Sequence, residues 1–173
     1  MDSPDRRQAA LLDLLRMNKA DLGAVLRRVT EQSAQVLGVQ RVSVWLYNDA
    51  RDNIVCQDLF KLTSWSHERG LKLHAKDFPR YFAAMDESRI LAAHDAAHDP
   101  RTSEFRDTYL DPFGITSMLD VPVWNRGKVV GVVCHEHTAA KRTWNTEEQE
   151  FATHVADLVG VALLENQLAW LKR

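Results

Sequence analysis

The stretch ITSMLDVPVWNRGKVVGVVC, residues 115–134, indicates the fold class of this chain most directly. Residues 115–124 have the pattern of a strand, Asn125, Arg126 and Gly127 form a tight turn, and residues 129–134 are apolar without a break. An apolar run of this length, bounded by turn residues, is typical of a central strand buried on both faces. The stretch therefore predicts a hairpin in the middle of a sheet.

A second hairpin is predicted upstream. Residues 41–47 alternate with a period of two, turn-forming residues occupy 48–53, and residues 54–62 form the return strand. On that return strand we expect one face to carry Ile54, Cys56, Phe60 and Leu62.

Helical patterns flank the two hairpins. Residues 5–37 have apolar positions at helical spacing, with a weak break at residues 18–23 that is either a kink or a junction between two helices. Gly38 is a plausible C-cap. The last helix is predicted to run from residue 146 to the end, opened by a capping pair that is either Asn145 with Glu148 or Thr146 with Gln149.

The middle of the chain, residues 63–114, is the least regular part. We expect a short helix at 77–85, a short strand at 89–93 and another short helix at 102–110. Excursions of this kind often carry a binding site.

Composition narrows the functional classes. The 173 residues, 45% of them hydrophobic, suit one globular domain, and a net charge of −2 gives no basic excess for nucleic acid. Cys56 and Cys134 lack the spacing of a disulfide framework or zinc site and fit a reducing compartment. The apolar residues near the start are too few for a signal or a membrane span, so we expect a cytoplasmic protein without direct membrane contact.

Five local motifs, in this order and spacing, resemble the GAF domain, a sensory and regulatory domain of bacterial signalling proteins such as sensor histidine kinases and diguanylate cyclases. The motifs are residues 37–45, 95–101, 114–123, 127–134 and 144–148. The resemblance implies a GAF/PAS-like α+β fold with a central antiparallel sheet of about five to six strands. It implies N- and C-terminal helices on one face and a ligand pocket under the irregular insert on the other. We expect a linker or leading helix at 1–19, the GAF domain at 20–165 and the start of a signalling helix at 166–173.

The candidate ligand site combines residues of the insert with residues of the sheet. Aromatic walls with a few convergent polar groups are typical of ligand pockets, although the same aromatic residues could simply pack the insert against the sheet. The candidates are Phe78, Tyr81, Phe82, Asp95, His98, Phe105, Tyr109, Ser117 and Cys134.

Several histidines and carboxylates are also of the kind that can bind a metal or a cofactor. Pro100 argues against a helix that would align His94 with His98, so Asp95 and Asp99 are either turn residues or ligand contacts. Alternation along the strand places Cys134 and Glu136 on one face and His135 and His137 on the other, so the four cannot share one metal site. His135 and His137 alone could hold a transition metal on their own face, but we expect none. The sequence does not identify a cofactor. Haem remains an alternative, because imidazoles in or near the insert could bind its iron: His67, His74, His94 and His98. A covalently attached bilin is not expected, because the insert contains no cysteine.

We expect a small-molecule-sensing module that is not itself an enzyme and that serves a histidine kinase or cyclic-di-GMP output domain of the same polypeptide. The alternatives are a ligand-free dimerisation scaffold and, more remotely, a redox enzyme using Cys134 or a haem sensor. A stripe on the last helix favours a parallel homodimer, and we expect the natural polypeptide to continue beyond Arg173. The stripe consists of Val161, Leu164, Leu168 and Leu171.

Overall fold

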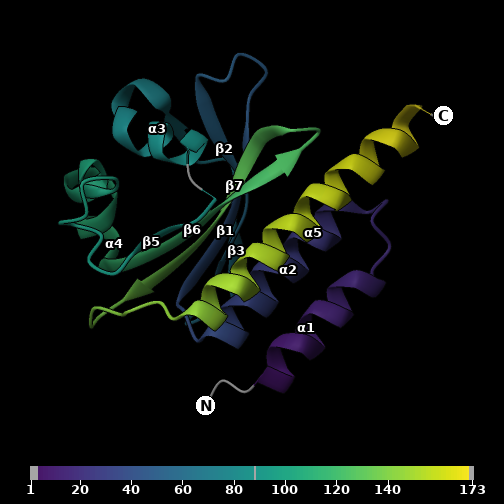
Figure 1. The fold of residues 1–173 in the computed structure, drawn as a ribbon, viewed down its shortest axis with the longest axis horizontal. Helices are drawn as coiled ribbons and strands as arrows, with labels where there is room; N and C mark the ends of the chain where they lie inside the picture. The colour runs from purple at the N-terminus through teal and green to yellow at the C-terminus, as the bar shows by residue number, and fades with distance from the viewer. Residues whose placement is uncertain (1–3, 88, 172–173) are drawn as a thin grey trace.

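An antiparallel sheet forms the centre of the computed structural model, which describes residues 4–87 and 89–171 (Figure 1). The strand order is β3-β2-β1-β7-β6-β5, and β4 pairs with β2 beside β3. The two predicted hairpins are β1 with β2 and β6 with β7, and β1 pairs with β7 to join them. The bounds are β1 Arg41–Tyr47, β2 Asn53–Lys61, β3 Ser66–Glu68, β4 Lys72–His74, β5 Leu91–Ala93, β6 Ile115–Asn125 and β7 Lys128–Thr138.

Two helices cover one face of the sheet, and a third packs on their outer side (Figure 1). They are α1 (Pro4–Arg16), α2 (Leu22–Leu37) and α5 (Thr146–Leu171). The weak break in the helical pattern is a junction between two helices, where the Asp21 side chain accepts a hydrogen bond from the Ala24 amide and starts α2. Gly38 ends α2 in the left-handed conformation, with φ of 62°, as its C-cap position favours.

The insert covers the opposite face of the sheet (Figure 1). It contains a 3₁₀ turn η1 (Ala75–Asp77), α3 (Pro79–Glu87), a 3₁₀ turn η2 (Ser103–Phe105), a π-helical turn η3 (Arg106–Leu110) and α4 (Asp111–Phe113). The helix predicted at 102–110 is thus η2 followed by η3, and the predicted helix at 77–85 corresponds to α3. Glu104 joins η2 to α3, because its carboxylate accepts hydrogen bonds from the first amides of α3, those of Arg80 and Tyr81.

One sequence expectation for β2 is wrong. The pairing of β1 with β2 shifts between Val44 and Trp45, so a bulge interrupts the alternation. Ile54 and Cys56 therefore belong to the core under the insert, whereas Phe60 belongs to the core under the helices. Leu62 also packs against the core under the helices.

The helix α5 begins with a reciprocal cap. The Asn145 amide donates to Glu148 at 3.0 Å and the Glu148 amide donates to the Asn145 side chain at 2.9 Å, so the first of the two predicted capping pairs forms. The side of α5 predicted to pack on the sheet is buried, as Phe151, Val155 and Val159 show.

Within the described ranges, no helix combines the length and apolarity needed to cross a bilayer.

Candidate ligand site beneath the insert

A buried polar centre lies between the insert and the sheet. The strands β6 and β7 contribute Asp120 and Glu136 to it, which are 0% and 1% exposed. Alternation along β7 places Cys134 and Glu136 on this face, as the sequence predicts, while His135 turns to the helical side and donates from Nδ1 to the Leu119 carbonyl.

Asp120 links the floor of the site to α3. Its Oδ2 accepts a hydrogen bond of 2.6 Å from the Tyr81 hydroxyl. Its Oδ1 is buried without a conventional hydrogen-bond partner among the described residues, and the weakly polar thiol of Cys134 lies beside the carboxyl group. Burial raises the pKa of Asp120 to about 7; the charge of Glu136 adds to the rise and the bond from Tyr81 opposes it. This side chain can therefore exchange a proton near neutral pH.

Glu136 links the floor to η3. Its two oxygens accept from Arg41 Nε at 2.7 Å and from the Tyr109 hydroxyl at 2.7 Å. Arg41 also stacks against the ring of Phe113, with 4.5 Å from the guanidinium carbon to the ring centroid. Burial opposes the charge of Arg41, but the charge of Glu136 and its hydrogen bond outweigh burial and raise the pKa of Arg41, so the guanidinium stays charged.

Aromatic rings from the insert fill the space above this centre. Phe105 is their hub, with ring centroids 4.2 Å from Phe78, 4.7 Å from Tyr81 and 5.9 Å from Tyr109. Phe82 packs edge-on against Tyr81 in the same cluster. Six of the nine candidate residues are thus brought together and buried: Phe78, Tyr81, Phe82, Phe105, Tyr109 and Cys134.

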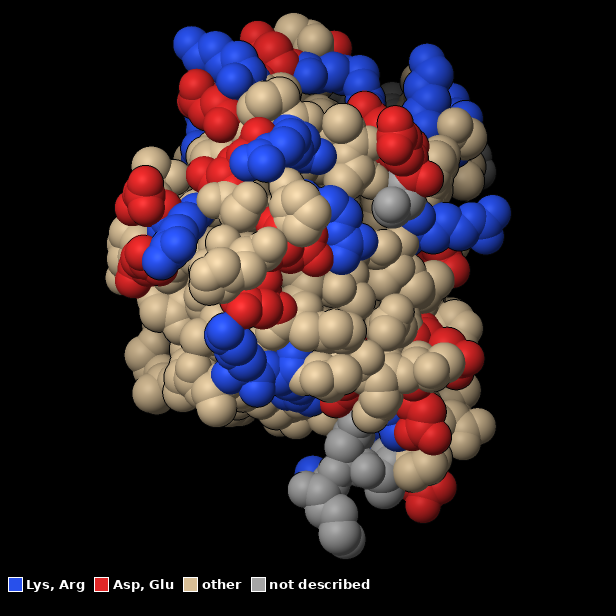
Figure 2. Space-filling model, turned by 60° about the vertical axis from the view of Figure 1, so that its left-hand side comes forward, with Lys and Arg blue, Asp and Glu red and all other residues tan. Residues whose placement is uncertain are grey.

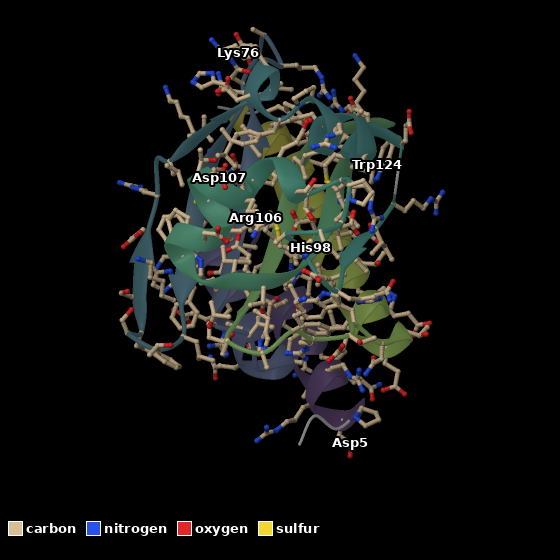
Figure 3. All side chains as sticks on the ribbon, turned by 90° about the vertical axis from the view of Figure 1, so that its left-hand side faces the viewer. Asp5, Lys76, His98, Arg106, Asp107 and Trp124 are labelled. Carbon is tan, nitrogen blue, oxygen red and sulfur yellow. The ribbon has the colours of Figure 1, made fainter. Side chains whose placement is uncertain are left out.

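The other three candidates lie outside the aromatic cluster. Asp95 and His98 pair with each other in a surface turn, and Asp95 also binds Lys141 at 2.5 Å. Figure 3 shows His98 on the covering layer that faces the viewer. Ser117 donates to the His94 carbonyl and accepts from the Arg142 amide, so its hydroxyl holds two loops together. Asp99 is a turn residue whose carboxylate holds Arg101.

The two thiols and the buried imidazole of His135 are held in their neutral forms. Burial raises the pKa of Cys56 to about 12 and raises that of Cys134 well above its ordinary value, so both stay as thiols at neutral pH. Burial also lowers the pKa of His135 to about 4, which keeps that ring neutral. In the described part of the chain, no three His, Cys, Asp or Glu side chains are grouped so that they could hold a metal ion.

The family is decided by comparison with known sequences. The sequence model of the GAF domain matches residues 21–163, most of the chain. The chain belongs to the GAF domain family. No curated protein matches it significantly.

Solved structures share this GAF fold at low sequence identity. A phycocyanobilin-bound GAF domain of a cyanobacterial phytochrome aligns with a TM-score of 0.76 and 17% identity, over 94% of this chain and 96% of that one. A methyl-accepting chemotaxis protein, residues 122 to 287, aligns with a TM-score of 0.74 and 18% identity, over 92% of this chain and 98% of that one. The GAF domain of an Acinetobacter phosphoenolpyruvate-protein phosphotransferase aligns with a TM-score of 0.72 and 15% identity, over 96% of each chain. The sheet, helical layer and insert are thus those of a GAF domain.

The three charged residues of this GAF domain's polar centre, Arg41, Asp120 and Glu136, were not predicted from the sequence as site residues, although Glu136 was placed on the same strand face as Cys134. A signal was present for Asp120, because it is an acidic residue within an otherwise apolar strand segment, MLDVPV at 118–123. The outer surface of the insert carries interleaved charges of both signs (Figure 2), so the unusual electrostatics lie in the interior.

Proposed function

We propose that this GAF domain is a sensory regulatory module that binds a small molecule between the insert and the sheet. The observation that carries the proposal is the polar centre itself, in which the Oδ1 atom of Asp120 is buried with only the weakly polar thiol of Cys134 beside the carboxyl group among the described residues. Buried charges and unsatisfied oxygens cost stability, and apolar side chains of similar volume would pack there at lower cost. A ligand that donates a hydrogen bond to Asp120 would offset that cost.

Binding at this centre would have to displace side chains. The hydroxyls of Tyr81 and Tyr109 occupy the two carboxylates, so a ligand with N–H or O–H donors and an apolar body would replace them and shift α3 and η3. Its effect on output equals the difference in its affinity for the two arrangements of the insert. The strands β6 and β7 carry the change toward α5, which packs against both.

The output side of the proposal is a cytoplasmic homodimer joined through α5 to an output domain of the same polypeptide, a histidine kinase or a cyclic-di-GMP enzyme. On α5, Val161 is 47%, Leu168 42% and Leu171 81% exposed, and Leu164 is partly buried. Figure 1 shows the end of α5 projecting past the sheet. Exposed apolar residues at heptad spacing favour a parallel partner helix. Arg173 lies outside the described residues.

Sedimentation tests the dimer with matched variants. We expect Leu168→Glu to convert a dimer to a monomer, because it places a charge in the seam. Leu71→Glu is the control, since Leu71 is exposed to a similar extent (45%) but lies just before β4, where its carbonyl accepts from the Cys56 amide of β2, and is not part of α5. A monomeric wild type, or equal effects of the two changes, contradicts the proposal.

A ligand-free dimerisation scaffold is the second candidate, and the close ring packing around Phe105 favours it. A catalytic role for the domain itself is not proposed, because both thiols are held un-ionised.

Native mass spectrometry and optical absorbance of the purified chain distinguish the two candidates. We expect a co-purified small molecule that is released on denaturation and is lost from Asp120→Asn but not from Asp107→Asn, a residue on the outer side of the insert (Figure 3). A haem band would identify a haem sensor. A mass equal to the bare polypeptide, with no absorbance beyond that of the aromatic residues, would favour the scaffold.

A further inference from the structure

An imidazole bridges two carboxylates on the helical face of the sheet, where its edge meets α2. His67 in β3 places Nδ1 at 2.9 Å from an oxygen of Asp58 in β2, and Nε2 at 3.0 Å from an oxygen of Glu31 in α2. The three side chains are 11%, 8% and 22% exposed. The ring of His67 also packs on Phe60, with centroids 4.9 Å apart.

The number of protons at this bridge follows from its geometry. A neutral imidazole has one N–H, so only one of its nitrogens can donate to a carboxylate. The other nitrogen would then direct a lone pair at an anionic oxygen. Asp58 already accepts a bond of 2.6 Å from the Thr30 hydroxyl and has the role of an acceptor. Both contacts of His67 are therefore favourable only when the ring is an imidazolium, which donates from both nitrogens.

The nearby cations do not neutralise the two carboxylates that would hold the imidazolium. From α2, Arg28 approaches Glu31 only at 3.8 Å and is shared with Asp13 of α1 at 2.9 Å. From the sheet edge, Glu68 pairs with Lys61 at 2.5 Å. Arg27 and Arg69 line the adjacent cleft, with no ion pair to Asp58 or Glu31 among the described contacts. The two carboxylates that face His67 thus have the imidazolium as their closest cation.

An open cleft borders the bridge. A cleft of about 530 Å³ separates the start of α2 from the β2–β3 edge, and Asp58 and His67 form part of its wall. Water entering this cleft could solvate either carboxylate once its contact is lost. Because α2 packs directly on α5, a change in how α2 is held at the sheet edge reaches the helix that carries the exposed stripe.

We propose that His67 is a proton-binding joint that fastens the β3 edge of the sheet to α2 when protonated and releases one of its two carboxylates when neutral. The joint responds to pH independently of any ligand beneath the insert. Loss of one ring proton as the pH rises loosens the edge.

Two NMR measurements on the intact chain test the joint. At about pH 5.5, we expect the ¹⁵N chemical shifts of both ring nitrogens of His67 to be those of protonated nitrogen. At about pH 8.5, we expect one of the two shifts to become that of an unprotonated nitrogen. Over the same range, hydrogen-exchange protection factors of the β3 amides should fall by about tenfold or more, the effect of losing one charge-assisted hydrogen bond. Protection factors already correct for the intrinsic dependence of exchange on pH.

Variants separate the joint from a general effect of pH. In Glu31→Gln the β3 protection should lose most of its pH dependence, while His74→Gln, a change at an exposed residue of the neighbouring β4, should leave it as in the wild type. A single protonated ring nitrogen at about pH 5.5 would overturn the proposal, whatever the variants do. Equal pH dependence in Glu31→Gln and the wild type would overturn it as well.

Discussion

Replacing Asp120 by Asn should change how the stability of the domain depends on pH. The carboxyl group is fully buried, and its pKa rises from an ordinary value of 3.8 to about 7. At 1.36 kcal/mol for each pH unit, this difference corresponds to about 4 kcal/mol between the protonated and ionised forms in the folded state. Asn keeps the shape and the acceptor for Tyr81 but cannot ionise.

The sign follows from where the proton binds more tightly. Because the folded pKa lies above the unfolded one, the folded state holds a proton that the unfolded state has lost. The contribution is complete below about pH 4, declines as pH rises, and is gone above about pH 7. We therefore expect the free energy of unfolding of the wild type to fall by up to about 4 kcal/mol across this range, beyond the trend shared with the variant.

Urea titrations at several pH values between about 4 and 8 measure this directly. The wild type and Asp120→Asn should diverge as pH rises, and at pH 8 the variant should be more stable by about 2 kcal/mol or more. The expected gain is below 4 kcal/mol because a neutral amide accepts a weaker hydrogen bond than a carboxylate does. Parallel stability curves for the two proteins would refute the argument from burial, and a less stable variant at pH 8 would show that the charged form is well solvated.

Three further changes test the packing. Glu136→Gln should lower the free energy of unfolding by about 3 kcal/mol, because it leaves the charge of Arg41 buried without its counter-ion, and thermal or urea unfolding will show whether it does. Gly131→Ala should prevent folding or lower the free energy of unfolding by several kcal/mol, measured by circular dichroism, because the added Cβ would lie 2.1 Å from a backbone oxygen of β1. Gly23→Ala is the control, because its Cβ would meet only an ordinary contact at 3.7 Å and should be tolerated. Asn145→Ala should cost about 1 kcal/mol in the same assay through loss of the α5 cap, and an unchanged midpoint would show that tertiary packing alone holds that helix end.

Local chemistry was enough to predict the elements of this fold. The strand pattern before the turn at 125–127 identified β6, the unbroken apolar run after it identified β7, and the cap residues Gly38 and Asn145 marked helix ends. These signals depend on residues a few positions apart, so they can be read along the chain. The resemblance built on their order is confirmed by the match to the GAF domain over residues 21–163.

Contacts between distant segments were decided only by the tertiary structure. Whether Phe60 faces the helices depends on a bulge that shifts β2 against β1, and periodicity within β2 alone cannot show it. The polar centre joins Arg41 to Glu136, 95 positions apart, and the bridge at His67 reaches Glu31, 36 positions away. Charged residues are buried at these points because a partner from another element meets them there. The sequence by itself determined which segments are strands and helices, and the folded chain determined which charges those segments bring together.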